Sequence, residues 1–161
     1  MADLNNLISP FFLNDKEIRK IIELLFFSYR DFTAGPDQIL EKLNFGRAHH
    51  RVIYFVGKKD KITIKELLGV LKITKQSLSR VLNQLVKEGF IVVSIGLDKR
   101  TKNLSLTRRG ISLENELSTI QIQKIKKVIN NFDQENIDGF KKILFEMIEI
   151  DNKKTFQHLN E

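Results

Sequence analysis

Apolar residues recur every three or four positions over most of this chain, the spacing that places them on one face of an α-helix. In residues 15–33 they stand at Ile18, Ile21, Ile22, Leu25, Phe26 and Tyr29. The same spacing predicts further helices over residues 47–58, 64–71, 74–88, 111–131 and 134–156. The stretch Thr-Ala-Gly-Pro at 33–36 is expected to end the first helix, with a short helical turn over residues 37–44. The pattern predicts a mainly α-helical protein.

Two of these helices are joined by a short turn in the middle of the chain. The sequence Thr-Ile-Lys-Glu at 63–66 is a capping box, in which the hydroxyl of Thr63 accepts from the amide of Glu66 while Glu66 reaches back. The turn follows at 71–73, and Thr74 is the expected N-cap of the next helix. Gly89 suits the left-handed position that ends it.

Two β-rich segments follow this pair of helices. IVVSIG (91–96) and NLSLT (103–107) bracket a polar tip, LDKRTK, and so predict a hairpin of two short strands. Two helices joined by a three-residue turn and followed by a β-hairpin form a winged helix-turn-helix. The expected fold is therefore mainly α with a small β-hairpin wing, flanked by N- and C-terminal helices.

The flanking helices carry more apolar surface than the winged core requires. In the helix 15–33, Leu24 and Phe27 add apolar side chains beside the main stripe, as either a central core helix or a helix shared with a second subunit would. The C-terminal helices must also bury apolar faces. We therefore expect three regions: N-terminal dimerisation helices (1–46), a DNA-binding domain (47–109) and C-terminal dimerisation helices (110–161).

The positive charge of the chain is concentrated in one segment. Residues 72–109 hold nine lysines and arginines and only two acids, whereas the other 123 residues hold eighteen cations and eighteen acids. The whole formal net charge of +7 therefore lies in about a quarter of the chain. A surface that binds a polyanion concentrates charge in this way, whereas an ordinary solvated surface spreads it.

The second helix of the pair has an outer face made of cations, amides and hydroxyls. These side chains belong to Lys75, Gln76, Ser79, Arg80, Asn83 and Lys87, and no carboxylate occurs before Glu88. In a helix that enters the major groove of DNA, Asn and Gln read adenine, Arg reads guanine and Ser reads either, while an acid would be repelled by phosphates. With Thr74 as the N-cap, backbone amides in the first turn of this helix remain free and can point at a phosphate.

The hairpin tip offers a second contact to DNA. Lys99, Arg100 and Lys102 lie on a narrow loop that can reach the adjacent minor groove, whose negative potential attracts guanidinium groups. Asp98 is an acid in this basic loop, and we expect its carboxylate to orient the side chain of Arg100. A solvated turn aspartate is the alternative.

Residues 62–110 resemble the MarR family of transcriptional regulators. The resemblance rests on ITIKELLGVLKITKQSLSRVLNQLVKEGFI, on the wing motif DKR (98–100) and on the closing LTRRG (106–110). Lys99 stands where family members often carry arginine. Within the family, FGRAHHRVIYFVG resembles the PetP-type subgroup.

The resemblance implies a homodimeric regulator that binds double-stranded DNA at a palindromic operator. Its recognition helix would span 74–88 and its wing 97–102. The family positions fall on Thr74, Lys75, Gln76, Ser77, Ser79, Arg80 and Asn83 in the helix, and on Asp98 and Arg100 in the wing. The family also commonly binds small anionic or phenolic effectors, for which His49, His50, Phe26, Phe27, Tyr29 and Tyr54 are candidate lining residues. The four aromatic residues are of a kind that more often belongs to the core.

Other classes of site fit the sequence poorly. His49 and His50 are adjacent, so on a helix they point about 100° apart, and further metal ligands are lacking nearby. No catalytic triad pattern or glycine-rich phosphate loop is present, so we expect neither an enzyme, a cofactor nor a metal site. The chain has no cysteine and its N-terminus resembles neither a secretory leader nor a membrane span, which suits the cytoplasm and excludes thiol-based sensing.

Two alternatives to an operator-binding regulator remain. A winged-helix module that docks on protein would have an apolar or acidic outer face, which residues 75–87 do not show. A binder of duplex RNA would also be basic, but the deep, narrow major groove of A-form RNA does not admit a recognition helix. Either would be an interaction module without operator specificity.

Overall fold

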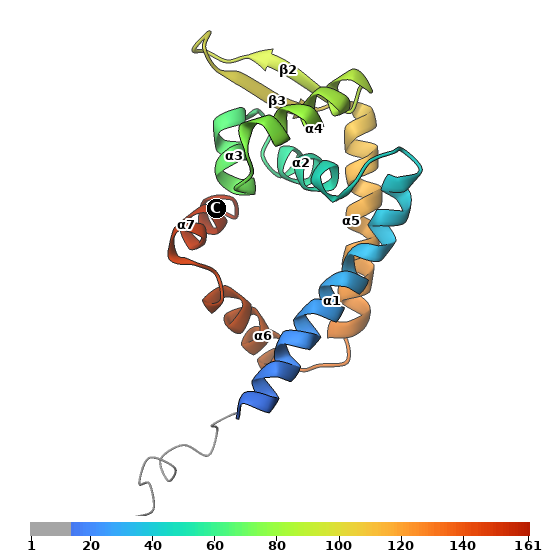
Figure 1. Ribbon diagram of the computed structural model, residues 1–161, viewed down its shortest axis with the longest axis vertical. Helices are drawn as coiled ribbons and strands as arrows, with labels where there is room; N and C mark the ends of the chain where they lie inside the picture. The colour runs from blue at the N-terminus through green and yellow to red at the C-terminus, as the bar shows by residue number, and fades with distance from the viewer. Residues whose placement is uncertain (1–13) are drawn as a thin grey trace, which may run out of the picture. The chain divides into compact units, whose positions relative to one another are not determined.

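The computed structural model describes residues 14–161, and most of this part of the chain is helical (Figure 1). The elements follow in the order α1 (Asp15–Glu41), α2 (Arg47–Lys58), β1 (Ile62–Thr63), α3 (Ile64–Leu71), α4 (Lys75–Lys87), β2 (Ile91–Ile95), β3 (Lys102–Leu106), α5 (Arg108–Ile129), α6 (Gln134–Glu146) and α7 (Ile150–His158). The expected fold class, helices with a small β wing, is confirmed.

The chain divides after Ala34 into two compact units. The first contains residues 14–34 of the described chain, which are the start of α1, and the second contains residues 35–161. Residues 1–13, for which the sequence predicted neither a leader nor a membrane span, lie outside the described residues. From residue 14 onward, no helix combines the length and the apolar character that a bilayer crossing requires.

The winged helix-turn-helix occupies the middle of the second unit. Thr74 caps α4 by accepting a hydrogen bond from the amide of Ser77 at 3.1 Å, and Gly89 follows α4 in the left-handed conformation with φ +76°. Lys72, in the turn between α3 and α4, is also left-handed, with φ +51°. The expected capping residue and the expected terminating glycine are both confirmed.

The wing is a three-stranded antiparallel sheet rather than an isolated hairpin. Its strand order is β1–β3–β2, with Val93 opposite Leu104 in the hairpin and Ile62 opposite Leu104 on the other side. β1 has only two residues, too few to show a period in the sequence. By pairing with β3 it ties the base of the wing to the start of α3.

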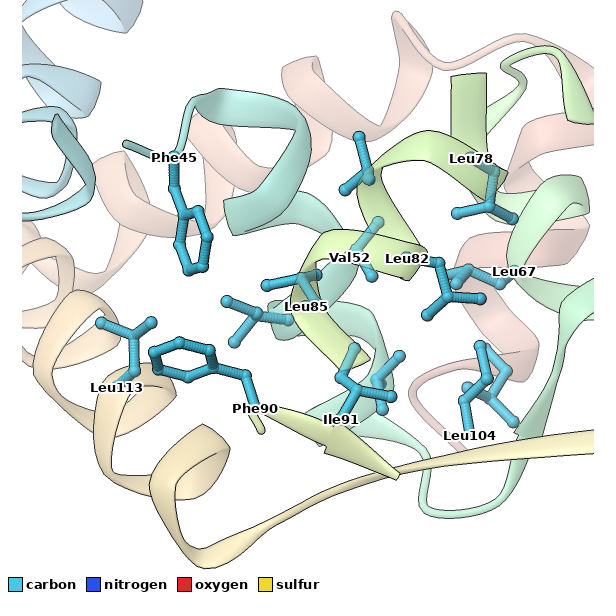
Figure 2. Close-up of a cluster of buried hydrophobic side chains, with 14 of the residues drawn as sticks. Phe45, Val52, Leu67, Leu78, Leu82, Leu85, Phe90, Ile91, Leu104 and Leu113 are labelled. Atoms are coloured by element: carbon cyan, nitrogen blue, oxygen red, sulfur yellow. The ribbon is translucent and has the colours of Figure 1, made fainter. Parts of the chain in front are cut away.

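One hydrophobic core holds α2, α3, α4, the sheet and the start of α5 together. Figure 2 shows leucines of α4 meeting Val52 of α2, Leu67 of α3 and Leu104 of β3. Leu67, Leu85 and Leu104 are completely buried. Burying a leucine stabilises a fold by about 1.5–3 kcal/mol. Because α4 supplies four buried side chains to this core, its opposite face is held outward rigidly.

The capping box of α3 is confirmed and carries an ion pair. Glu66 Oε2 accepts from the amide of Thr63 at 2.8 Å, and the amide of Glu66 donates to Thr63 Oγ1 at 3.1 Å. Lys59 Nζ donates to Glu66 Oε1 at 2.7 Å. The hydrogen bond from Lys59, followed by that from the Thr63 amide, lowers the pKa of Glu66 from 4.5 to about 2.

Glu66→Gln is expected to lower the free energy of unfolding by about 0.5–1 kcal/mol at pH 7, since the pair with Lys59 is lost at a solvent-screened position. The folded pKa lies below the unfolded one, so the charged form contributes stability above about pH 4.5, and this is lost as pH falls towards 2. Urea unfolding of both proteins between pH 7 and pH 2 should show the difference shrinking. A difference independent of pH would contradict this account.

Two expected helix boundaries are wrong. α1 does not end at 33–36 but continues to Glu41 with Pro36 inside it, and the expected short turn at 37–44 is mainly the last turn of this helix. Pro36 removes one backbone hydrogen bond and crowds the preceding turn. However, Pro36 and Leu40, one turn further on, are both buried, so packing overrides the local preference.

The expected helix 134–156 is two helices, α6 and α7, which Met147–Glu149 separate. Phe145 at the end of α6 makes an edge-on contact with Phe156 of α7 at 6.0 Å between ring centroids. Lys153 Nζ also lies over the ring of Phe145, 5.0 Å from its centroid. These contacts require the chain to turn between the two helices, and an uninterrupted helix would separate the residues.

Candidate nucleic-acid interface

The outer face of α4 is polar and accessible. Leu78, Val81, Leu82 and Leu85 are buried. Since successive residues of a helix are about 100° apart, the side chains opposite this buried face are those of Gln76, Arg80, Asn83 and Lys87. All four are exposed. Within residues 14–161, no other helix or strand therefore covers the face of α4 for which the sequence predicted DNA contact.

The remaining sequence-predicted residues of α4 lie at its N-terminus and flanks. Thr74, Lys75 and Ser79 are exposed, whereas Ser77 is half-buried. Thr74 Oγ1 donates to Ser77 Oγ at 2.9 Å, in addition to accepting from the Ser77 amide. Ser77 is thus engaged with the cap, while Lys75 and Ser79 lie on the flank that faces the wing.

A groove runs between α4 and the wing. Its volume is about 480 Å³. Three lysines stand at it, Lys75 and Lys87 from α4 and Lys102 from β3, together with the polar side chains of Ser79 and Asn83. Its apolar lining comes from Ile64, Leu78, Leu82, Val86 and Val93. An apolar lining between ammonium groups suits a chain of alternating sugars and phosphates.

The wing tip is a tight turn that Asp98 organises. The amide of Gly96 donates to the carbonyl of Thr101 and the amide of Thr101 to the carbonyl of Asp98, both at 2.8 Å. Asp98 Oδ1 accepts from the backbone amide of Arg100 at 3.0 Å. The expectation that this carboxylate orients the Arg100 side chain is therefore wrong: it shapes the backbone. Lys99, Arg100 and Lys102 are exposed.

The basic segment keeps its charge uncompensated. All nine cations of residues 72–109 are exposed, and across the described residues 14–161 none of them forms an ion pair. Within the part of the chain that the structure describes, Arg109 is the one of the nine whose side chain the fold engages: it donates to the carbonyl of Glu88 and lies over the ring of Phe90, 4.1 Å from the centroid. The other eight remain available to a polyanion.

The two adjacent histidines both pack against other parts of the fold. His49 Nδ1 accepts from the amide of Gly46, and His49 Nε2 lies 2.9 Å from Oε1 of Gln84 on α4. Burial lowers the pKa of His50, against the opposing effect of Asp37 and Glu114. Gln84 was not among the residues predicted from the sequence, because its partner is 35 positions away and no local pattern joins them.

Comparison with known proteins places these observations in context. The sequence profile of the MarR family matches residues 43–101, from near the start of the α1–α2 connection to the wing tip. Over 151 residues, the chain is 40% identical to the HTH-type transcriptional regulator PetP of Rhodobacter capsulatus, an alignment that covers 93% of this chain and 91% of that protein.

Solved structures show the same fold. The chain resembles Streptococcus pneumoniae FabT, crystallised in complex with DNA, with a TM-score of 0.72 and 20% identity over 81% of this chain and 94% of that one. An S. aureus MepR–DNA complex gives a TM-score of 0.59 and 20% identity over 84% of this chain and 97% of that one. At these identities the likeness establishes the fold alone.

Proposed function

Because this chain belongs to the MarR family of transcriptional regulators, we propose that it binds double-stranded DNA sequence-specifically as a homodimer. The observation that carries the proposal is the exposed and unpaired positive charge on α4 and the wing. Charge of this kind attracts phosphates, and the amides and hydroxyls interleaved with it can discriminate bases. FabT and MepR, which share the fold, were crystallised with DNA.

In the proposed complex α4 enters the major groove. Gln76, Arg80 and Asn83 would meet base edges, and Thr74, Lys75 and Ser79 would contact the DNA backbone at the N-terminus and flank of α4. Ser77 would support the cap that places them, and Lys87 would contact the DNA backbone from the C-terminal end of the helix. Lys99 and Arg100 would enter the neighbouring minor groove, with Asp98 fixing the turn that presents them. The strand between the two grooves would then cross between α4 and the wing, where Lys102 stands.

The proposed dimer uses helices outside the DNA-binding domain. Large apolar side chains are exposed on α1, α5 and α6, including Phe26 at 63% and Ile143 at 63%. Large contiguous apolar patches mark interaction sites, and monomeric proteins rarely expose them. We assign residues 1–46 and 110–161 to dimerisation and residues 47–109 to DNA binding. A two-fold dimer places two recognition helices about one DNA turn apart, so half-site centres should lie ~10 bp apart.

Selection of bound sites from random duplex DNA tests this function directly. We expect a palindromic motif with half-sites at that spacing, and light scattering should give the mass of two chains. Duplex RNA of the selected sequence serves as the control and should bind without preference, because its major groove does not admit α4. Absence of an enriched motif, or one asymmetric site bound by a single chain, would refute the proposal.

A further inference from the structure

A polar link joins the recognition helix α4 to the first turn of α2 and to the α1–α2 connection before it. Gln84 lies on the flank of α4 away from the wing, where its Oε1 is 2.9 Å from His49 Nε2. Its Nε2 donates to Glu88 Oε1 at 3.1 Å and to the carbonyl of Asn44 at 3.4 Å. The amide of Gly46 donates to His49 Nδ1 at 3.1 Å. The side chains of His49 and Gln84 thus join chain segments 35 and 40 positions apart.

The link has one self-consistent proton arrangement. Since the Gly46 amide can only donate, His49 Nδ1 must be an acceptor and the ring proton sits on Nε2. Nε2 then donates to Gln84 Oε1, which directs the amide nitrogen of Gln84 towards two acceptors, the Glu88 carboxylate and the Asn44 carbonyl. Turning over the Gln84 amide would face donor with donor and acceptor with acceptor, and turning over the His49 ring would put C–H groups where both nitrogens now lie, so the network holds both side chains in one orientation.

Aromatic packing holds both ends of the link in place. The imidazole of His49 stacks on Phe45 with centroids 4.6 Å apart and planes 8° from parallel. Phe45 meets Phe90 edge-on at 5.3 Å, and both phenylalanines are buried. Arg109 covers Phe90 and donates to the carbonyl of Glu88 at the end of α4. The link therefore ends on well-packed parts of the fold.

The position of Gln84 makes it sensitive to rotation of α4. Asn83 precedes it, and Arg80 lies one turn earlier on the same helix. With side-chain tips about 6 Å from a helix axis, a rotation of about 10° moves them by about 1 Å. Base-edge hydrogen bonds fail over displacements of that size. A contact that fixes the rotation of α4 therefore affects base discrimination without touching DNA.

We propose that His49 and Gln84 are positioning residues that fix the rotation of α4 against the first turn of α2 and the α1–α2 connection before it, and that they set sequence specificity without contacting DNA. This inference rests on the proposed function, because it presupposes that α4 reads DNA. Gln84 and Gln76 therefore have different roles on the same helix. The side chain of Gln84 forms hydrogen bonds within the protein, whereas that of Gln76 is exposed.

The test compares the affinity of full-length dimers for the selected operator with that for a scrambled duplex of equal length. His49→Phe keeps the ring that stacks on Phe45 and removes both nitrogens, and Gln84→Met keeps the side-chain length and removes the amide. Each is expected to lower the ratio of specific to scrambled affinity about tenfold, as loss of about 1.4 kcal/mol would. The double variant should be no worse than either single variant, since both break one link.

Two controls separate positioning from general loss of structure. His50→Phe changes the adjacent residue of α2, which makes no hydrogen bond to α4, and should leave the ratio unchanged. A variant that merely unfolds in part lowers both affinities equally. If the wild-type protein prefers the operator and both single variants keep the same ratio of operator to scrambled affinity, this inference is overturned while the proposed function stands. If the wild-type protein prefers no duplex, the proposed function fails and the inference fails with it.

Discussion

Replacing Gly110 with alanine is expected to lower the free energy of unfolding by about 3 kcal/mol or more, among the largest effects of any single substitution in this chain. A Cβ at this position would overlap the carbonyl oxygen of Phe90 and lie 3.2 Å from Cβ of Leu106. The carbonyl cannot move aside easily, because it also accepts from the amide of Thr107 at 3.0 Å.

The geometry around Gly110 joins the wing to α5. Thr107 caps α5 by accepting from the amide of Gly110 at 3.1 Å, and its hydroxyl donates to the carbonyl of Gly89 at 2.6 Å. An alanine would separate the first turn of α5 from the start of β2, and the buried Phe90 would lose its packing. The effect should thus appear as lost stability and as a displaced wing.

Gly139→Ala provides the matched control. Gly139 lies in α6, and within residues 14–161 no atom other than those of its chain neighbours and its own helix backbone lies within 4 Å of the position that an alanine Cβ would occupy. Its replacement should raise stability by about 0.5–1 kcal/mol through helix propensity. Urea unfolding of the three proteins measures both effects. Equal unfolding free energies for Gly110→Ala and the wild type would contradict the close approach of α5 to Phe90.

Substitutions on α4 and on the wing should have different consequences for DNA binding. Gln76→Ala and Asn83→Ala are each expected to cost about 1–3 kcal/mol at the favoured base and to relax preference there, because each removes an amide that we propose reads a base edge. Arg100→Ala should weaken binding to every sequence and reduce the steepness of the salt dependence by about 0.9 for each phosphate that the variant no longer neutralises.

Fluorescence anisotropy with the selected operator and its single-base variants measures these effects. Lys141→Ala removes the same charge as Arg100→Ala but lies on α6, paired with Asp138, and should leave affinity nearly unchanged. Should all three interface variants weaken binding equally on every sequence, the division into base-reading and backbone-holding residues would be wrong.

Local signals were sufficient to predict the helix α4 and its ends. Thr74 and Gly89 mark the ends of α4 by hydrogen-bonding and conformational preferences that involve only neighbouring residues, and both act as expected. The capping box at Thr63 was predictable for the same reason. The exposure of Gln76 and Asn83 followed from the position of the leucines on the opposite face.

Features that depend on distant contacts could not be predicted from the sequence. Pro36 stays within α1 because tertiary burial outweighs its local cost, and Phe145 meets Phe156 only because the chain turns between α6 and α7. Two-residue β1 is too short to show a pattern. The bond between His49 and Gln84 has no signature in either segment.

The role of Asp98 could not be predicted for another reason. A carboxylate two residues before an arginine can bond either the arginine side chain or its backbone amide, and the sequence is the same in both cases. The tight turn from Gly96 to Thr101 brings the amide of Arg100 to the carboxylate. The wing was predicted correctly in position, whereas the role of its acid depended on backbone geometry.

The dependence of operator affinity on salt concentration tests most directly the claim that unpaired cations on α4 and the wing bind a DNA backbone. The logarithm of the association constant should fall linearly with the logarithm of salt concentration, by about 0.9 for each phosphate neutralised, giving a steep slope for two protomers. A slope near zero would show that this surface does not displace counterions from DNA, and would contradict the account.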